Sequence, residues 1–413
     1  MANSPNKEST GSRTASSLKV INDKPGNATA KTKAAQSAAG NSDTEARPTL
    51  KTIAYMTNLA VTTVSRALKD APDISAPTKA RVRLVADQIG YRPNRAGIRL
   101  RTGRTQVISL VISLEEEVMG ITSQMVLGIS DVLSDTPYHL IVTPYSQQQG
   151  PLEAIRYICE TRSADGVIFS STEPDDERVR YATAHGMPFA THGRTDMGIQ
   201  HPYHDFDNTK FTLEAVSRLA AKQRRNLLLL SPPASLNYYR HCIAGFNQGL
   251  REHGINGHIS STLDTSAKLD EIEAMIKDLL SGPDRPDGII CTSGSSAIGV
   301  IAGIEQAGLT VGKEVDIVSK QSISLLSKIR KEVGTINEDV RNAGRQLATA
   351  VLRSIDGEAP ENLQSVEYPD MPSPDFPSPD LQSPDLPLHD PQSKDQTSDT
   401  LKKRKAERPD NTG

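Results

Sequence analysis

The stretch of sequence that decides the fold lies at residues 48–105 and reads PTLKTIAYMTNLAVTTVSRALKDAPDISAPTKARVRLVADQIGYRPNRAGIRLRTGRT. Apolar residues recur in it three and four positions apart, which is the period of an amphipathic helix. The pattern predicts three short helices. The first of them presents an apolar face made of Leu50, Ile53, Ala54 and Thr57. Asn58 follows this face, and asparagine readily adopts the left-handed conformation that a tight turn needs.

The second predicted helix, at about residues 61–69, combines an apolar face with a short polar face. The inward side is made of Val61, Val64, Ala67 and Leu68, and the outward side of Thr62, Thr63, Ser65 and Arg66. Ser75 can cap a third helix that has Pro77 in its first turn. The apolar stripe of that third helix is Val82, Val85, Ala86 and Ile89.

Three short helices around a minimal core indicate a helix-turn-helix, although any small basic three-helix unit shares this pattern. In a helix-turn-helix the second helix enters the major groove of DNA. Arg66 ends the polar face of that helix, and an arginine can donate two hydrogen bonds to a guanine edge.

The charges of the chain are segregated along it. The formal net charge is only −3, from 47 Lys and Arg against 50 Asp and Glu. Residues 47–105 carry a net charge of +9, whereas residues 106–364 carry −10. A compact basic module is therefore joined to a larger acidic domain, and the module is expected to bind an anionic partner.

Residues 106–364 alternate between strand-like and helix-like runs. Strands are expected at 106–113, 138–144, 165–171, 188–193, 225–231, 287–293 and 315–320. Helices are expected at 120–134, 151–162, 175–185, 208–222, 238–253, 267–281, 295–307 and 338–356. Most of the strands are continuous apolar runs, as in parallel sheets that are covered on both faces. The length favours two similar α/β lobes with a ligand cleft between them at the carboxyl ends of their strands.

Both ends of the chain are predicted to be disordered. Residues 1–46 have almost no apolar periodicity, and residues 365–413 contain a degenerate repeat that ends in Pro-Asp. Such segments bury too little apolar surface to offset the entropy of ordering, and frequent proline prevents helices and sheet ladders. These two ends account for much of the low hydrophobic fraction of 36%.

Several classes of protein are disfavoured by what the sequence lacks. The cysteines, Cys159, Cys242 and Cys291, are far apart and odd in number, so neither a disulfide framework nor a zinc site is expected. We expect no metal, because only His201 and His204 are close together among the loop histidines, and no cofactor. No apolar run approaches 18 residues, so no membrane partner is expected. No catalytic constellation is found, so we predict that the chain is not an enzyme.

Two motifs carry a resemblance to a known family. TVSRAL (63–68), followed by GYRPNRAGIRLRTGRT (90–105) and then a strand, resembles the lactose-repressor/galactose-repressor (LacI/GalR) family of bacterial transcription regulators. The resemblance covers about residues 48–360. HPYHDFDN (201–208) and DIVSKQS (316–322) are most similar to rhizobial regulators of α-glucoside use.

The resemblance implies a fold and a function for each part of the chain. It implies a helix-turn-helix domain at 47–93, a hinge helix or linker at 94–105, and a core at 106–364 like a periplasmic binding protein. It implies a homodimer that binds a near-palindromic double-stranded operator and responds to a small-molecule effector, in this case a carbohydrate. We expect a repressor of sugar-utilisation genes that is cytoplasmic and associates with the nucleoid when it binds DNA.

The same resemblance implies which residues contact DNA. They are Thr49, Val61, Thr62, Thr63, Ser65, Arg66, Asn94, Arg95 and Leu100. Leu100 matches the hinge leucine that wedges into the minor groove and kinks the DNA. The chain departs from the family at the turn, where Ala60 replaces a serine that would cap the second helix, and at Gly97, which weakens the hinge helix.

Polar residues at strand ends are the candidates for binding the effector. They are Ser170, His192, Arg194, Asp207, Arg240 and Asn337, with Asp205 and Asp339 close to them in sequence. Arginine and carboxylate groups hydrogen-bond to paired hydroxyls, which is the chemistry of a sugar site. The family usually has an arginine where this chain has Cys242 and an acidic residue where it has Gly294. Either the effector differs, or neighbouring residues substitute, or the response to an inducer is weak.

Two other functions compete with a DNA-binding regulator. A solute- or sugar-binding protein without a DNA function would share the two-lobed core, but the +9 module and the absence of a signal segment argue against it. A sugar-active enzyme would need an acid/base pair of carboxylates, and no such pair stands out in the sequence.

Overall fold

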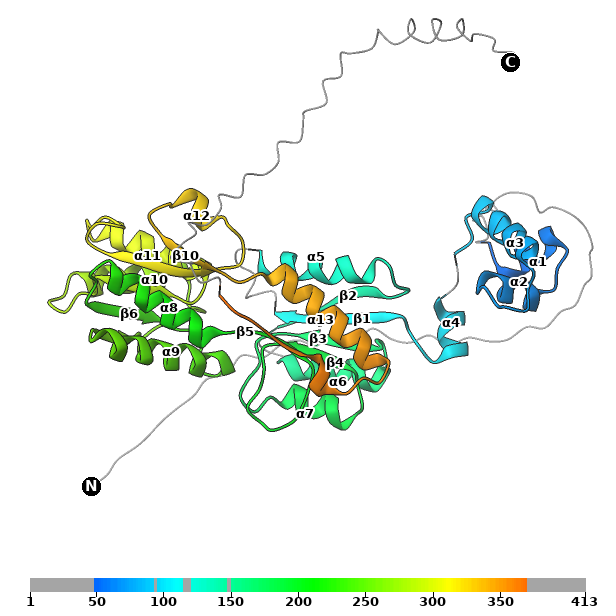
Figure 1. The fold of residues 1–413 in the computed structure, drawn as a ribbon, viewed down its shortest axis with the longest axis horizontal. Coiled ribbons are helices and arrows are strands. Elements are labelled where there is room, and N and C mark those ends of the chain that lie inside the picture. Colours follow the sequence, from blue (N-terminus) through cyan, green and yellow to red (C-terminus); the bar gives the residue numbers. More distant parts are fainter. Residues whose placement is uncertain (1–47, 93–94, 114–119, 147–149, 370–413) are drawn as a thin grey trace, which may run out of the picture. The chain divides into compact units, whose positions relative to one another are not determined.

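The computed structural model describes residues 48–92, 95–113, 120–146 and 150–369. The chain divides into two compact units, Met1–Arg92 and Pro93–Gly413. The two units are drawn in Figure 1 and are described separately below.

The first unit is a bundle of three helices, α1 (Leu50–Thr57), α2 (Val61–Leu68) and α3 (Ala76–Gln88). Its small core is formed by the buried side chains of Ile53, Ala54, Val64, Ala67, Val82 and Ala86. Asn58 has a φ of 52°, which confirms the left-handed turn expected between α1 and α2. The sequence therefore predicts this unit well, because its apolar residues follow the helical period.

Two details of the first unit differ from the expectation. Val61 is 39% exposed, because it is the first residue of α2 and lies at the edge of the core. Ser75 occupies the cap position of α3, but its hydroxyl lies 2.8 Å from that of Thr78 and does not bond to a backbone N–H of the helix.

The second unit begins with helix α4 (Arg95–Thr102) and continues into a two-lobed core. The first lobe contains β1 (Val107–Ser113), β2 (His139–Tyr145), β3 (Gly166–Phe169), β4 (Phe189–His192), β5 (Tyr203–Phe206) and β11 (Gln364–Glu367). All pairings are parallel, in the order β11-β5-β4-β3-β1-β2. Helices α5 (Ile121–Leu133) and α13 (Val340–Ile355) cover one face of this sheet, and α6 (Pro151–Thr161) and α7 (Glu177–Ala184) cover the other.

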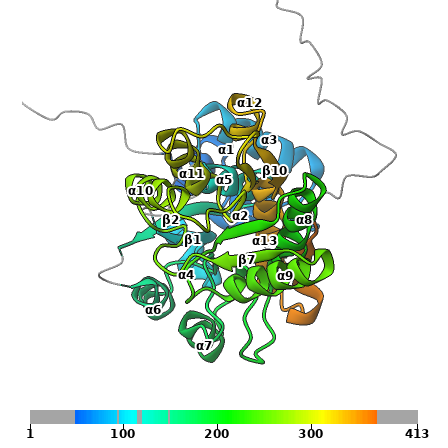
Figure 2. The ribbon, with the colours of Figure 1, turned by 90° about the vertical axis from the view of Figure 1, so that its left-hand side faces the viewer.

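The second lobe repeats this plan. Its strands are β6 (Asn226–Leu230), β7 (Asn256–Ile259), β8 (Gly288–Cys291), β9 (Asp316–Gln321) and β10 (Gly334–Asn337), all parallel in the order β10-β9-β8-β6-β7. Helices α8 (Asn208–Ala221) and α9 (Asn237–His253) cover one face, and α10 (Leu269–Leu280) and α11 (Gly294–Gln306) cover the other, as Figure 2 shows. The short helices α12 (Leu326–Ile329) and η1 (Pro360–Leu363) complete the core.

The chain passes between the lobes directly after two strands. After β5 it crosses at Asp207 into α8 of the second lobe, and after β10 it crosses at Glu338 and Asp339 back into α13 of the first. Because parallel strands bring their carboxyl ends to one edge, these crossings place polar residues where the two sheets face each other.

The core extends beyond the predicted start of the tail. The sequence predicts that residues 365–367 belong to a disordered tail, but they lie in β11, which pairs with β5. The hydroxyl of Ser365 lies 2.8 Å from Nδ1 of His204. The pairing is possible because these residues precede the first Pro-Asp of the repeat and can complete the edge of the ladder. Residues 370–413 of the tail, like residues 1–46, are outside the described residues.

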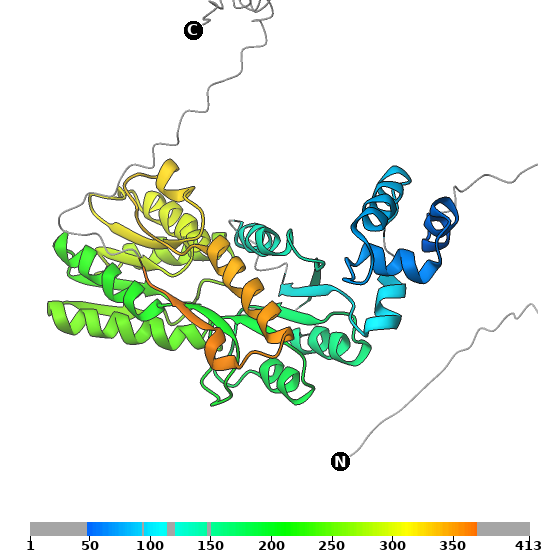
Figure 3. The same ribbon diagram turned by 45° about the vertical axis from the view of Figure 1, so that its right-hand side comes forward.

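Helices α5 and α13 pack backbone to backbone at two glycines. α13 is the long orange helix in Figure 3. A Cβ atom added at Gly128 of α5 would lie 1.9 Å from the carbonyl oxygen of Arg341, and one at Gly344 of α13 would lie 2.5 Å from that of Met125. Side chains larger than hydrogen would therefore separate the helices that cover the first sheet.

Gly128→Ala should destabilise the core by about 1–3 kcal/mol, the usual cost of overpacking, because α13 must move away from α5. Gly97→Ala is the matched control, since a Cβ atom at Gly97 meets nothing within 4 Å. Urea unfolding of both variants measures the difference. Equal midpoints for Gly128→Ala and wild type would contradict the close packing.

Candidate functional site

The outward face of α2 is the candidate surface for binding DNA. Val61, Thr62 and Arg66 are exposed, and Thr63 and Ser65 are partly exposed. Nη2 of Arg66 lies 2.5 Å from Oδ2 of Asp73, in an ion pair whose side chains are 59% and 46% exposed. The guanidinium is thus held at the surface by a partner that solvent also reaches, and such exposed pairs contribute little to stability.

The other predicted DNA contacts have different positions. Thr49 caps α1, where its side chain accepts a hydrogen bond from the backbone N–H of Thr52 at 3.3 Å. Arg95 opens helix α4, and Leu100 of the same helix is 91% exposed. Asn94 lies outside the described residues.

A cavity of about 550 Å³ lies between the two lobes. Many hydroxyl groups line its wall, and they come from Ser113, Thr122, Ser170, Ser171, Thr265, Ser266, Thr292, Ser293, Ser295, Ser296 and Ser322. Phe206 and Tyr238 add aromatic rings to the wall. The volume is within the range of sites for small molecules, and a wall rich in hydroxyls suits a ligand that both donates and accepts hydrogen bonds.

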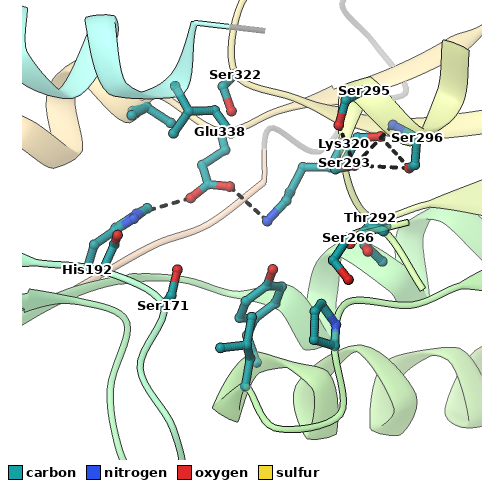
Figure 4. Close-up of a pocket in the computed structure, with 18 of the residues that line it drawn as sticks. Ser171, His192, Ser266, Thr292, Ser293, Ser295, Ser296, Lys320, Ser322 and Glu338 are labelled. Atoms are coloured by element: carbon teal, nitrogen blue, oxygen red, sulfur yellow. Dashed lines mark hydrogen bonds and ion pairs between the residues drawn. The ribbon is translucent and has the colours of Figure 1, made fainter. Parts of the chain in front are cut away.

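A carboxylate at the crossing between the lobes links them across this cavity (Figure 4). Oε1 of Glu338 lies 3.2 Å from Nε2 of His192, the last residue of β4 in the first lobe. Its Oε2 lies 2.9 Å from Nζ of Lys320, in β9 of the second lobe. Lys320 also donates to Oδ1 of Asn208 at 3.2 Å. We call His192, Glu338 and Lys320 the inter-lobe bridge.

The bridge holds two charges with little exposure to solvent. Burial opposes ionisation of Glu338, but the positive charge of Lys320 and the hydrogen bond from His192 outweigh it and hold the pKa of Glu338 far below its usual value. Burial also opposes the charge of Lys320, but the carboxylate of Glu338 outweighs it and raises the pKa of Lys320. Both groups are therefore charged at neutral pH.

The structure brings only some of the predicted effector residues to the cavity. Ser170 and His192 line it. Arg194 lies behind the wall, where its Nε is 2.7 Å from Oδ2 of the lining residue Asp205. The remaining three lie away from the wall: Asp207 caps α8, Arg240 pairs with Asp196 at the surface, and Asn337 accepts a hydrogen bond from Gln321.

Sequence reasoning missed Lys320 and Glu338, the charged pair of the cavity. The available signals were a lysine within the otherwise buried strand β9 and an acidic residue directly after β10.

The two positions at which this chain departs from the family, Cys242 and Gly294, lie nearby. Cys242 is fully buried, which raises the pKa of its thiol to about 12, and Gly294 lines the cavity at the start of α11. The cation and the carboxylate that pair on this wall are Lys320 and Glu338, and they lie at positions other than the two where the family usually has charged residues.

Arg178 of α7 positions the rim of the cavity from behind. Its guanidinium is 4% exposed and forms an ion pair with Asp176 at 2.7 Å. It also donates to the carbonyl oxygens of Ser170 at 3.0 Å and Ser171 at 2.8 Å. Ser171 has a φ of 55°, a conformation that is uncommon for serine, so these bonds stabilise a strained turn at the wall.

Arg178→Met should lower the free energy of unfolding by about 3–5 kcal/mol at neutral pH, because it leaves Asp176 buried without its partner. Burial raises the pKa of Asp176, but Arg178 outweighs it and the net shift is downward. The stabilisation by the pair is therefore complete above the ordinary carboxyl pKa of about 3.9 and is lost as the pH falls below it.

The deficit of the variant should thus shrink as the pH approaches 3. Arg180→Met, which removes an exposed ion pair of the same helix with Asp175, is the control and should cost under about 1 kcal/mol. Unfolding curves between pH 3 and pH 7 measure both variants. A deficit for Arg178→Met that does not change with pH would argue against the pairing.

Neither a metal site nor a membrane span is found in the part of the chain that the structure describes. There, no three His, Cys, Asp or Glu side chains gather in a way that could hold a metal ion. Within the same residues, no helix is long and apolar enough to cross a membrane.

Comparison with known proteins covers both units. Residues 49–94 match the family described as bacterial regulatory proteins, lacI family. Residues 108–370, more than half of the chain, match the family described as periplasmic binding proteins and sugar binding domain of LacI family.

Individual proteins show the same similarity. The transcriptional regulator RafR of Escherichia coli is 32% identical over 320 residues, which are 76% of this chain and 94% of RafR. AglR of Rhizobium meliloti is 29% identical over 324 residues, 76% of this chain and 90% of AglR. The crystal structure of the lac repressor dimer bound to operator and an anti-inducer has a TM-score of 0.68 at 20% identity, covering 79% of this chain and 97% of that one.

RafR and AglR are both helix-turn-helix transcriptional regulators, as the pattern of residues 48–105 predicts. Both units of the chain match one family, and the match extends over nearly the whole length of each relative. The chain therefore belongs to the LacI family of bacterial regulatory proteins.

Proposed function

We propose that this chain is a homodimeric repressor of sugar-utilisation genes whose affinity for its operator is controlled by a sugar-like effector. The observation that carries the proposal is the combination, in one chain, of an exposed recognition helix and a hydroxyl-lined cavity between two lobes. The match to the sugar-binding domain of the family supports the class of effector. Two copies of the module would read the two halves of a near-palindromic operator.

Each part of the chain has a role in the proposed function. Residues 47–93 bind DNA, residues 94–105 form the hinge, and residues 106–364 together with β11 bind the effector and dimerise. Within these parts, the exposed face of α2 reads bases and Leu100 of α4 wedges into the minor groove. Such a protein works in the cytoplasm and associates with the nucleoid while it is bound to its operator.

The effector acts by favouring one arrangement of the lobes. A ligand shifts a conformational equilibrium only if it binds one state better than the other. A ligand in this cavity contacts residues of both lobes, such as Ser170 and Ser293, so its contacts change with the angle between them. Helix α4 directly precedes β1 of the first lobe, so lobe movement is transmitted to the hinge through the chain itself.

A solute-binding protein without a DNA function is the alternative. This function would account for the cavity, but it would not account for the basic module or for the match of residues 49–94 to the family of bacterial regulatory proteins. Salt-sensitive binding to upstream DNA in a gel-shift assay separates the two functions, since binding to phosphates weakens steeply as the salt concentration rises.

Arg66→Ala should abolish the preference for operator over random DNA while weak, nonspecific binding remains. A bidentate contact between arginine and guanine contributes about 1–3 kcal/mol of discrimination, or roughly 5- to 150-fold in affinity. Fluorescence anisotropy on an operator fragment and on a scrambled fragment measures the ratio. Arg83→Ala is the control, because Arg83 is a half-exposed arginine of the same unit that lies on α3 and pairs with Asp70. An equal loss on both DNA fragments for Arg66→Ala would reject base readout.

A further inference from the structure

Inside the cavity, the charged side chains of the wall are paired with opposite charges. Lys268 and Lys320 are the basic residues of the wall, and Asp205 and Glu338 are the acidic ones. Lys320 and Glu338 pair directly across the cavity, and Asp205 pairs with Arg194 behind the wall. Lys268 lies at the exposed rim. The interior of the cavity therefore offers a ligand no net charge to neutralise.

The inter-lobe bridge still has hydrogen-bonding capacity to spare. A lysine ammonium has three donors, and the contacts of Lys320 with Glu338 and Asn208 account for two of them. Each oxygen of Glu338 has two lone pairs, and each has one contact in the bridge. A donor and acceptors thus lie side by side on the wall, an arrangement that suits neighbouring hydroxyl groups.

A charged ligand would have to break this pairing. A phosphate or carboxylate would be repelled by Glu338, and drawing Lys320 towards it would leave Glu338 buried without its partner. Separating a buried ion pair is strongly unfavourable, because the remaining charge is not compensated. An uncharged polyhydroxy ligand adds hydrogen bonds to both groups and leaves the pair intact.

The size and lining of the cavity further restrict the class of ligand that fits it. The volume of about 550 Å³ equals the space of roughly eighteen waters at about 30 Å³ each, which is more than a single hexose displaces. Nζ of Lys320 lies 5.2 Å from the ring centre of Tyr238 and 5.4 Å from that of Phe206. The polar bridge therefore lies beside two apolar rings, and a sugar presents the same mixture of hydroxyl and C–H surfaces.

We propose that the inter-lobe bridge makes the cavity selective for an uncharged polyhydroxy ligand of disaccharide size and discriminates against sugar phosphates and sugar acids. The inference rests on the proposed function, because it takes this ligand to be the effector. Lys320 and Glu338 act as specificity-determining residues. Since His192 belongs to the first lobe and Lys320 to the second, a ligand held by the bridge contacts both lobes at once.

Isothermal titration calorimetry on the full chain tests the selectivity. Maltose, melibiose, sucrose and cellobiose are the neutral probes, and maltose 1-phosphate, melibionate, sucrose 6-phosphate and cellobionate are their charged counterparts. At least one neutral disaccharide should bind, with its charged counterparts at least tenfold weaker. A charged probe that binds as tightly as the best neutral one overturns the inference.

The double variant Lys320→Met with Glu338→Gln tests the residues. It removes both charges together, so that neither is left buried alone. The variant should bind the neutral disaccharide about tenfold more weakly and should discriminate against charged probes by less than threefold. Arg156→Met with Glu153→Gln, which removes a surface pair of α6 at 3.2 Å, is the control and should match wild type in both respects. Unchanged discrimination in the double variant of the bridge overturns the assignment.

Operator binding, measured on the same preparations, separates this inference from the proposed function. If the chain binds operator but none of the neutral disaccharides, the inference is wrong and the DNA-binding function stands. If disaccharides bind as expected but operator is not bound, the selectivity stands and the proposed regulator is rejected. Should the double variant fail to fold, the comparison of neutral and charged probes on wild type still decides the selectivity.

Discussion

The carboxylate of Glu338 is the group on which the geometry of the core depends. It lies where the chain crosses between the lobes, accepts from His192 in one lobe and pairs with Lys320 in the other. A charge with so little exposure is tolerated only when it is paired, so the lobes must keep both partners within reach of it. Parallel strands bring these partners together, because the carboxyl ends of the strands and the crossings that follow them face one another across the cavity.

The same arrangement explains how a small molecule could control a DNA-binding unit that is separate from the cavity. The core has a net charge of −10 and the module has a net charge of +9. Residues 95–102 form a helix that leads directly into β1, and its exposed Leu100 is free to engage a partner. A ligand that spans both lobes therefore acts on a strand that continues into the hinge. Arg66, held at the surface by Asp73, can exchange that exposed carboxylate for DNA at little energetic cost.

Much of this fold follows from local patterns, whereas much of the cavity does not. Strands β1, β3, β6 and β8 are predicted because each is a continuous apolar run. β5, β7 and β11 lie outside the expected strands because each has only four residues and contains polar ones. Ser170 and His192 were found because they end or follow strands, but Asp207 has the same signal and caps a helix. Lys320 and Glu338 were missed because their role depends on an ion pair between a residue of β9 and a residue that follows β10. The local sequence around either residue does not predict that pair.

The proposed coupling between the cavity and operator binding can be tested by a single comparison. Coupling between two binding sites is reciprocal, so a sugar that weakens operator binding must itself bind more weakly to the operator complex, by the same factor. The most direct measurement is to titrate a disaccharide that the chain binds into the full chain, once without and once with saturating operator DNA. If the two sites are coupled, operator DNA should lower the affinity for the sugar by about 5- to 150-fold, the usual range of such coupling. Equal affinities in the two titrations would contradict it.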